Sequence, residues 1–237
     1  MKKDNIKLAI IILISALFPM LTQGIWGQSP YVKSAGMMYI LWSLVNFLFL
    51  STIVEIVGSY GKMFKLENLK TNKPTFIINV IVYFAFLIFV NLYFVQQLYI
   101  RDNSLLNTLT NLNILIMIML LYVINLYCGQ FPDSEEKENT NIYTLNKKTS
   151  FKNGRDKFGI VIGEYTEGIV IGYEIFKYED IKTVYKDTKN DALVIKGKND
   201  KGNFRVSIQA EKSRAAVKRI LTRAQRENKL TNGKINL

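Results

Sequence analysis

Long uncharged runs of apolar residues, separated by short polar segments, fill the first half of the chain. Four of these runs reach about 20 residues, the length with which an α-helix crosses the hydrocarbon core of a bilayer. They predict transmembrane helices over residues 8–26, 37–57, 75–95 and 109–127. Pro19 lies within the first run, where we expect it to kink the helix rather than end it, because neighbouring groups can satisfy the freed carbonyl.

The first apolar run has a second interpretation, because it follows Met-Lys-Lys as the apolar region of a signal peptide does. It extends to Trp26, however, which is longer than an ordinary signal peptide, and no Ala-x-Ala cleavage site follows it. We therefore interpret this run as a membrane-spanning helix.

A different pattern follows a polar connector that begins after Cys128 and carries an acidic patch at Asp133, Glu135, Glu136 and Glu138. Five short strand-like segments then follow: apolar residues alternate with others around residues 158–162, 181–185 and 204–208, and short apolar runs occur at 169–171 and 192–196. Polar turns containing glycine are expected at residues 163–168 and 196–203. Short alternating segments joined by such turns predict an antiparallel β-sheet.

The last pattern of the chain is helical. Apolar residues at spacings of three, four and seven form one face of a predicted helix that starts after Gln209 and ends near Asn228; they are Val217, Ile220, Leu221 and Ala224. We expect this face to close one open side of the sheet. The predicted fold is therefore a bundle of four transmembrane α-helices followed by an antiparallel β domain with a C-terminal α-helix.

The order of these elements resembles a pleckstrin-homology-like (PH-like) domain. Gly168-Ile169 and Tyr178-Glu179-Asp180-Ile181 are similar to a pattern in bacterial membrane-anchored PH-like modules of uncharacterised families. The resemblance covers about residues 142–228 and consists of fold-determining residues. A sharp rise in charged residues after residue 128 marks a domain boundary there. The predicted organisation is therefore a transmembrane domain at 1–128, a linker at 129–141, the PH-like domain at 142–228 and a flexible tail at 229–237.

The basic residues of the loops set the expected orientation. Lys2, Lys3 and Lys7 precede the first predicted helix, and four lysines lie between the second and third: Lys62, Lys65, Lys70 and Lys73. The other two loops carry one base each, Lys33 and Arg101. By the positive-inside rule, both termini are cytoplasmic. Together with richness in Lys, Asn and Ile, this predicts a multi-pass protein of a bacterial cell membrane.

Catalytic chemistry is not indicated by the composition. The chain has no histidine and one cysteine, Cys128, so an internal disulfide is excluded and the usual zinc ligands are missing. No phosphate-binding glycine motif is present. We therefore predict no catalytic, cofactor-binding or metal site, no cofactor, and a protein that is not an enzyme.

Polar residues inside the apolar runs are candidates for function. Glu55 is the one acid among them, and intramembrane carboxylates are often functional, although its place near a helix end also suits a structural interface residue. Several asparagines either join helices by hydrogen bonds or line a polar cavity; the candidates are Asn46, Asn79, Asn91 and Asn113.

Six bases cover the rest of the predicted C-terminal helix: Lys212, Arg214, Lys218, Arg219, Arg223 and Arg226. They form either a solvated face, a surface for anionic lipid headgroups, or a contact for a protein partner, with nucleic acid disfavoured for a tethered domain. The favoured function is a non-enzymatic membrane protein whose PH-like domain mediates protein or anionic-lipid interaction at the inner leaflet. An immunity protein against a membrane-acting toxin and a transporter component, as a homo-oligomer or with a partner subunit, are the alternatives.

Overall fold

A computed structural model describes residues 3–33, 35–101, 104–111, 113–114, 116–118, 120–121, 133–145, 161–230 and 234–235. The chain divides into two compact units. The first unit comprises Met1–Gly58 and Ile77–Val123, and the second comprises Ser59–Phe76 and Ile124–Leu237. The segment between the second and third long helices therefore belongs to the C-terminal unit, although helices flank it in the sequence.

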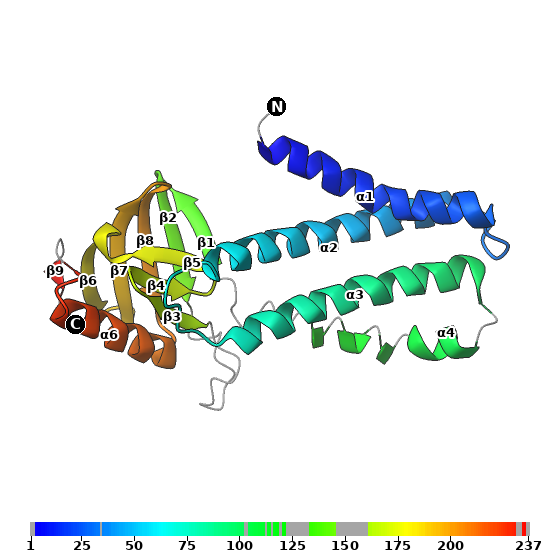
Figure 1. Cartoon of the computed structure of the whole chain (residues 1–237). Coiled ribbons are helices and arrows are strands. Elements are labelled where there is room, and N and C mark those ends of the chain that lie inside the picture. The colour runs from blue at the N-terminus through cyan, green and yellow to red at the C-terminus, as the bar shows by residue number, and fades with distance from the viewer. Residues whose placement is uncertain are drawn as a thin grey trace. The chain divides into compact units, whose positions relative to one another are not determined.

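Three long helices occur in the N-terminal half: α1 (Lys3–Trp26), α2 (Gly36–Met63) and α3 (Lys73–Tyr99) (Figure 1). Each is long and apolar enough to span a membrane, which confirms three predicted spans. α1 continues through Pro19, as expected. Apolar side chains such as Leu13 and Met37 are exposed, 64% and 74%, so the helices are apolar on their outer faces too. Such all-round hydrophobicity is typical of helices surrounded by lipid.

The fourth predicted span, residues 109–127, lies partly outside the described residues. A short helix, α4 (Ser104–Leu109), precedes it. Within the span, residues 113–114, 116–118 and 120–121 are helical. Ile118 is buried in the same cluster as Trp42, Phe86 and Phe94 of the first unit. The described part of this segment therefore packs with the other helices.

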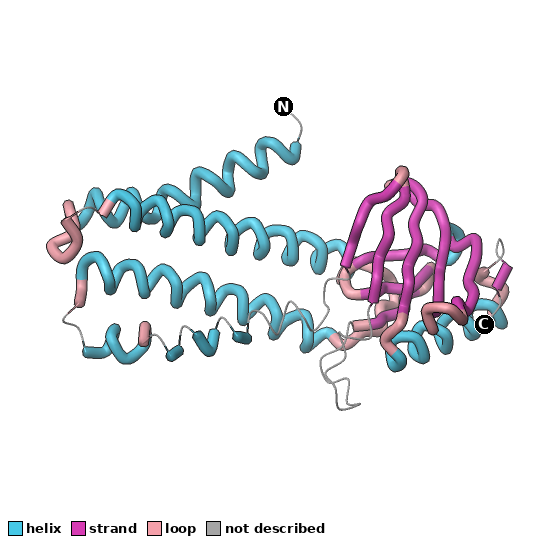
Figure 2. The backbone as a smooth tube through the Cα atoms, turned by 180° about the vertical axis from the view of Figure 1, so that it is seen from behind, coloured by secondary structure: helices cyan, strands magenta, loops and turns pink. Residues whose placement is uncertain are grey.

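The C-terminal unit contains two sheets (Figure 2). The larger has the order β1-β2-β8-β7-β6-β9, with the bounds β1 (Asp133–Lys137), β2 (Thr140–Leu145), β8 (Gly202–Ile208), β7 (Ala192–Asn199), β6 (Ile181–Asp187) and β9 (Lys234–Ile235). The smaller has the order β3-β4-β5, with β3 (Ile162–Tyr165), β4 (Gly168–Ile171) and β5 (Glu174–Lys177). The prediction of an antiparallel sheet is correct for most neighbours, but β2 pairs with β8, and β6 with β9, in parallel.

The predicted linker at residues 129–141 is wrong in part, because β1 and the start of β2 lie within it. The two strands form a hairpin whose turn residues Glu138 and Asn139 have φ values of 47° and 59°, as two-residue turns between antiparallel strands require. β1 is an edge strand, and its residues 135–137 are exposed. It therefore has no apolar alternation that the sequence could reveal. Likewise, the predicted flexible tail contributes buried Leu230 and strand β9.

The two predicted turns are shorter than expected. Residues 163–165 belong to β3, residues 197–199 belong to β7, and each connection needs two residues, 166–167 and 200–201. Gly163, Gly168 and Gly197 lie in strands at points of close contact, whereas Gly202 opens β8 with a φ of 112°. A Cβ at Gly168 would lie 2.1 Å from the carbonyl oxygen of Phe176. Glycine within a strand often marks a place where another backbone approaches closely, and this is the case here.

One apolar core joins the sheets to the C-terminal helix α6 (Glu211–Arg226). The four predicted apolar residues of α6 are all buried in this core, so the helix and its inner face are confirmed. Figure 1 shows α6 running beneath the strands along one side of the domain. Phe176 and Phe204 meet in the core with ring centroids 5.0 Å apart. The sheet-rich domain with a C-terminal helix is thus present as predicted.

Candidate functional site

The loop between α2 and α3 is built into the β domain. The Lys70 amide donates to the Glu164 carbonyl at 2.8 Å, and the Glu164 amide donates to the Lys70 carbonyl at 3.1 Å. The Thr166 amide donates to the Glu67 carbonyl at 3.1 Å. These bonds form an antiparallel bridge that extends the smaller sheet beyond β3. The loop is therefore part of the domain's structure.

Small and turn-forming residues permit this close approach. A Cβ at Gly163 would lie 3.0 Å from Cβ of Thr71 and 3.2 Å from the Lys70 carbonyl oxygen. Asn68 has a φ of 55°, a left-handed conformation that asparagine tolerates better than most residues. Its side-chain amide donates to Oγ1 of Thr166 at 3.2 Å. The local sequence on both sides of the contact thus fits the pairing.

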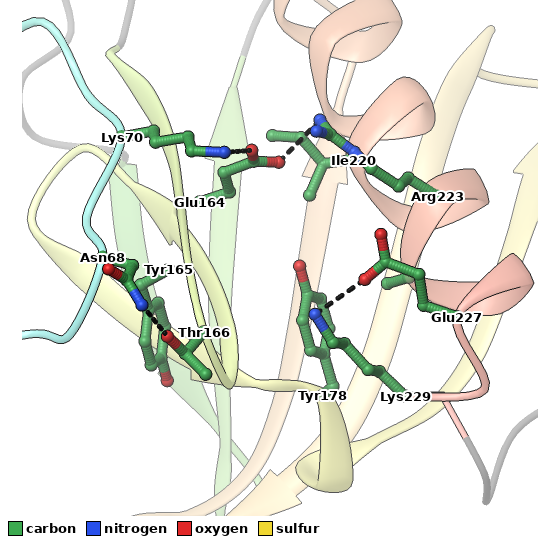
Figure 3. A pocket seen from close by; sticks show the side chains of 11 residues that line it. Asn68, Lys70, Glu164, Tyr165, Thr166, Tyr178, Ile220, Arg223, Glu227 and Lys229 are labelled. Atoms are coloured by element: carbon green, nitrogen blue, oxygen red, sulfur yellow. Dashed lines mark hydrogen bonds and ion pairs between the residues drawn. The ribbon is translucent and has the colours of Figure 1, made fainter.

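Glu164 connects three elements through its side chain. Its Oε1 lies 3.7 Å from Nζ of Lys70 in the loop, and its Oε2 accepts a hydrogen bond of 2.8 Å from Nη2 of Arg223 in α6 (Figure 3). The Glu164 side chain is only 17% exposed, whereas that of Lys70 is 73% exposed. Exposed ion pairs contribute about 0–1 kcal/mol. The Arg223 side chain is less exposed, at 47%, and its bond to Glu164 is shorter, so this is the stronger of the two links.

A cavity of about 380 Å³ lies where the loop, the β3–β4 hairpin, the 3₁₀ turn η2 (Tyr178–Asp180) and α6 meet. Its charged lining consists of Lys70, Glu164, Arg223, Glu227 and Lys229. Nζ of Lys229 lies 2.7 Å from Oε2 of Glu227. The cavity wall therefore carries three cations and two carboxylates.

Tyr178 supplies a neutral polar group to this cavity. Its side chain is nearly buried, with 6% exposed, and Figure 3 shows it between the hairpin and α6 with its hydroxyl turned toward Ile220. Among the residues that the structure describes, this hydroxyl has no hydrogen-bond partner. Burial, and then the charge of Glu164, raise the pKa of Tyr178 to about 12. The hydroxyl therefore remains a proton donor at neutral pH.

The six bases predicted as a surface on the C-terminal helix separate into two groups. Nη1 of Arg214 donates to Oδ1 of Asp191 at 2.8 Å, and Arg223 binds Glu164, so these two arginines tie α6 to the domain. Arg223 is itself exposed, and so are the other four bases: Lys212, Lys218, Arg219 and Arg226. The candidate anionic-lipid surface is therefore narrower than the sequence indicated.

The intramembrane candidates come together only in part. Asn46 donates to Oδ1 of Asn91 at 3.1 Å, and Asn91 donates back to Oδ1 of Asn46 at 2.8 Å. Nε1 of Trp42 also donates to Asn91, at 2.7 Å. This cluster joins α2 to α3, which favours the interpretation of these amides as interhelical contacts, worth about 1 kcal/mol or less each.

The remaining intramembrane candidates lie elsewhere in the first unit. Asn79 is buried in α3, whereas Asn113 is exposed. Glu55 is exposed on α2, and no ion pair between Glu55 and Lys62 forms in the described chain.

Sequence reasoning missed the residues that define the cavity. Lys70 was interpreted only as a topological signal, Glu164 as part of a turn, and Tyr178 as part of a fold pattern. One signal was available, because a glycine within a strand pattern, such as Gly163, often marks a close approach of another backbone. Comparison of the chain with protein-family models, curated proteins and solved structures gives no match.

Proposed function

We propose that this chain is an integral membrane protein that acts by recognition rather than catalysis. Its PH-like domain binds the anionic lipid surface of the inner leaflet, on which it is held by the α2–α3 loop. The observation that carries this proposal is the backbone pairing of Lys70 with Glu164. A loop that joins two membrane-spanning helices lies at a membrane surface, and a domain that shares hydrogen bonds with that loop stays there.

The same pairing supports a fourth crossing. The loop between Met63 and Lys73 and the β domain lie on one side of the membrane if they are hydrogen-bonded to each other. α3 carries the chain from that side to the other, so the segment between Tyr99 and Asp133 has to return. The helical residues around buried Ile118 support residues 109–127 as this span.

The lysines of the loop support a cytoplasmic location for the domain. Residues 59–76 hold four lysines against one glutamate, whereas the segment between α1 and α2 holds Lys33 alone. Positive loops remain on the cytoplasmic side. In a bacterial cell membrane, both termini would then be cytoplasmic.

The arrangement of the strands supports a PH-like domain. β3, β4 and β5 form one antiparallel meander, β6, β7 and β8 form another, and α6 follows directly. The hairpin of β1 and β2 extends the second sheet by a parallel pairing with β8. The sequence predicted only antiparallel neighbours, so this parallel pairing is an addition to the predicted arrangement.

The outer face of α6 supports lipid over a protein partner. Lys218, Arg219 and Arg226 are exposed and have no ion-pair partner among the described residues. Each base near an anionic membrane contributes about 1 kcal/mol of attraction. Glu164 links this helix to the α2–α3 loop through Arg223 and Lys70.

A spin label tests the proposal in the intact protein. With Cys128→Ser and Gln225→Cys, a nitroxide on exposed α6 is compared in zwitterionic and anionic nanodiscs. We expect anionic lipid to reduce the collision rate with a water-soluble nickel complex several-fold. Salt at 1 M, where the Debye length is about 3 Å, should reverse the effect.

The charge of α6 is then reversed at Lys218→Glu, Arg219→Glu and Arg226→Glu, which should abolish the lipid effect. The matched control reverses three exposed lysines of β6, β7 and the turn between them, Lys186, Lys189 and Lys198, and should retain the effect. Equal nickel accessibility in both lipids for the parent protein would overturn the lipid proposal.

A further inference from the structure

We propose that the cavity between the α2–α3 loop, the β3–β4 hairpin and α6 binds a hydroxyl-bearing phosphodiester monoanion, the chemistry of a glycerophospholipid headgroup. This inference deepens the proposed function and rests on it for the membrane as the source of the ligand. The cavity itself, its charges and the Tyr178 hydroxyl stand independently of that source.

The charge of the wall selects a monoanion. Lys70, Arg223 and Lys229 carry three positive charges, and Glu164 and Glu227 carry two negative ones. A ligand with one negative charge makes the occupied site neutral. A phosphodiester carries one charge, whereas a phosphomonoester carries about 1.5 to 2 at pH 7 and would leave an excess of negative charge in a partly enclosed space.

Tyr178 provides an independent sign of a ligand. Its hydroxyl belongs to a side chain that is 6% exposed, and it has no partner in the described part of the protein. The hydroxyl is therefore available as a donor to a ligand in the cavity. An acceptor oxygen in the cavity, such as a phosphoryl oxygen held between Arg223 and Tyr178, would satisfy it.

The two carboxylates explain why the ligand carries hydroxyl groups. Glu164 has one cation at each oxygen, and Glu227 is bound by Lys229. A carboxylate has about four acceptor sites, so capacity remains on both side chains. Bare phosphate offers them mainly acceptor oxygens, whereas a glycerol moiety offers O–H donors. The wall thus matches a ligand that both accepts and donates hydrogen bonds.

Size and position agree with a headgroup. A volume of about 380 Å³ falls at the small end of the range for small-molecule sites. The loop residues Asn68 and Lys70 form one wall, and this loop joins two membrane-spanning helices. A lipid headgroup and a soluble glycerophosphodiester share the required chemistry, and the experiment separates these sources.

The test is calorimetric titration of the full-length protein in zwitterionic nanodiscs. The probes are glycerophosphoglycerol and inorganic phosphate. We expect saturable binding of the diester and at least tenfold weaker binding of phosphate. Competition by nanodiscs that contain phosphatidylglycerol identifies the lipid as the source. Binding of the soluble diester without such competition would overturn the membrane source.

Matched variants locate the binding. Tyr178→Phe removes only the hydroxyl and should weaken diester binding about tenfold, the loss expected for one hydrogen bond to a charged group. Tyr185→Phe, in β6, should leave it unchanged. Arg223→Gln should abolish binding, whereas Arg219→Gln on the outer face of the same helix should not. Equal effects within either pair, or no saturable binding, would overturn the inference.

The two proposals fail separately. The nickel-accessibility experiment reports the outer face of α6, whereas the titration reports the cavity. If anionic lipid does not change the nickel accessibility but the diester still binds, lipid-surface docking is excluded and the proposed cavity site is retained. The thermal unfolding of Tyr178→Phe is measured in parallel, and an unchanged midpoint assigns its effect to binding.

Discussion

Replacing Gly197 with alanine is expected to destabilise the β domain by about 3 kcal/mol, the upper end for added volume in a packed core. Gly197 lies in β7, and a Cβ there would lie 2.1 Å from the carbonyl oxygen of Asp180 and 2.5 Å from the ring of Phe204. The phenyl ring can shift, but the backbone carbonyl of the η2 turn cannot move without displacing the start of β6. The strand itself therefore has to move.

This prediction is checked by thermal unfolding of the domain in the full-length protein, followed by circular dichroism and by proteolysis. Each 1 kcal/mol shifts the midpoint by roughly 4–8 °C in a domain of up to about 100 residues, so we expect a fall of more than about 10 °C. The control is Gly61→Ala in α2, where no atom lies within 4 Å of the added Cβ. A similar midpoint for both variants would contradict the close contact.

Truncation of Phe204 to alanine is expected to cost about 3–5 kcal/mol, as for other large buried aromatics. Its side chain is 2% exposed and packs against Phe176 in the centre of the core. The cavity left behind lies between the two sheets, where backbone hydrogen bonds limit collapse. Loss of this residue therefore affects both sheets at once.

The same unfolding experiment measures this loss, with Phe64→Ala as the control because Phe64 is 40% exposed. Combining Phe204→Ala with Gly197→Ala adds a sharper test. Removal of the ring relieves only one of the two contacts at Gly197, and the Asp180 carbonyl remains 2.1 Å from the new Cβ. We therefore expect no rescue, and a double variant more stable than Phe204→Ala would contradict the geometry.

Regular patterns in the sequence were sufficient for the main elements. Uniformly apolar runs predicted α1, α2 and α3, and the alternation of Phe204, Val206 and Ile208 with polar neighbours predicted β8. The apolar face of α6 was predicted residue by residue. The long helices are apolar on all faces, and β8 and α6 bury apolar side chains in a periodic way, so both patterns are visible in the sequence.

Contacts made by backbone atoms and by single charged residues produce no periodic pattern in the sequence and could not be predicted from it. β1 is an edge strand with exposed acids, so its residues resemble a solvated linker. The bridge of Lys70 to Glu164 uses main-chain groups, and its side chains are about 94 positions apart in the chain. Arg223 and Arg219 look alike in sequence, but only the fold places Arg223 next to Glu164. The candidate site therefore could not be assembled from the pattern alone.

The structure gives one of the loop lysines, Lys70, a second role. In the sequence, Lys70 counts as one of four charges that set orientation. In the fold, it also belongs to the domain that this orientation would place in the cytoplasm. One segment thus carries the lysines from which the orientation is predicted and also forms part of the cavity wall.

A disulfide between positions 70 and 164 tests most directly whether the loop and the domain are joined. The two residues exchange both backbone hydrogen bonds, a geometry with Cα atoms about 5.5 Å apart, which a disulfide can bridge. In a Cys128→Ser background, Lys70→Cys with Glu164→Cys should cross-link efficiently on mild oxidation of intact membranes. Lys70→Cys with Lys189→Cys, in the β6–β7 turn, should not. Absence of the first cross-link in a protein that inserts and accumulates normally would contradict the docked loop.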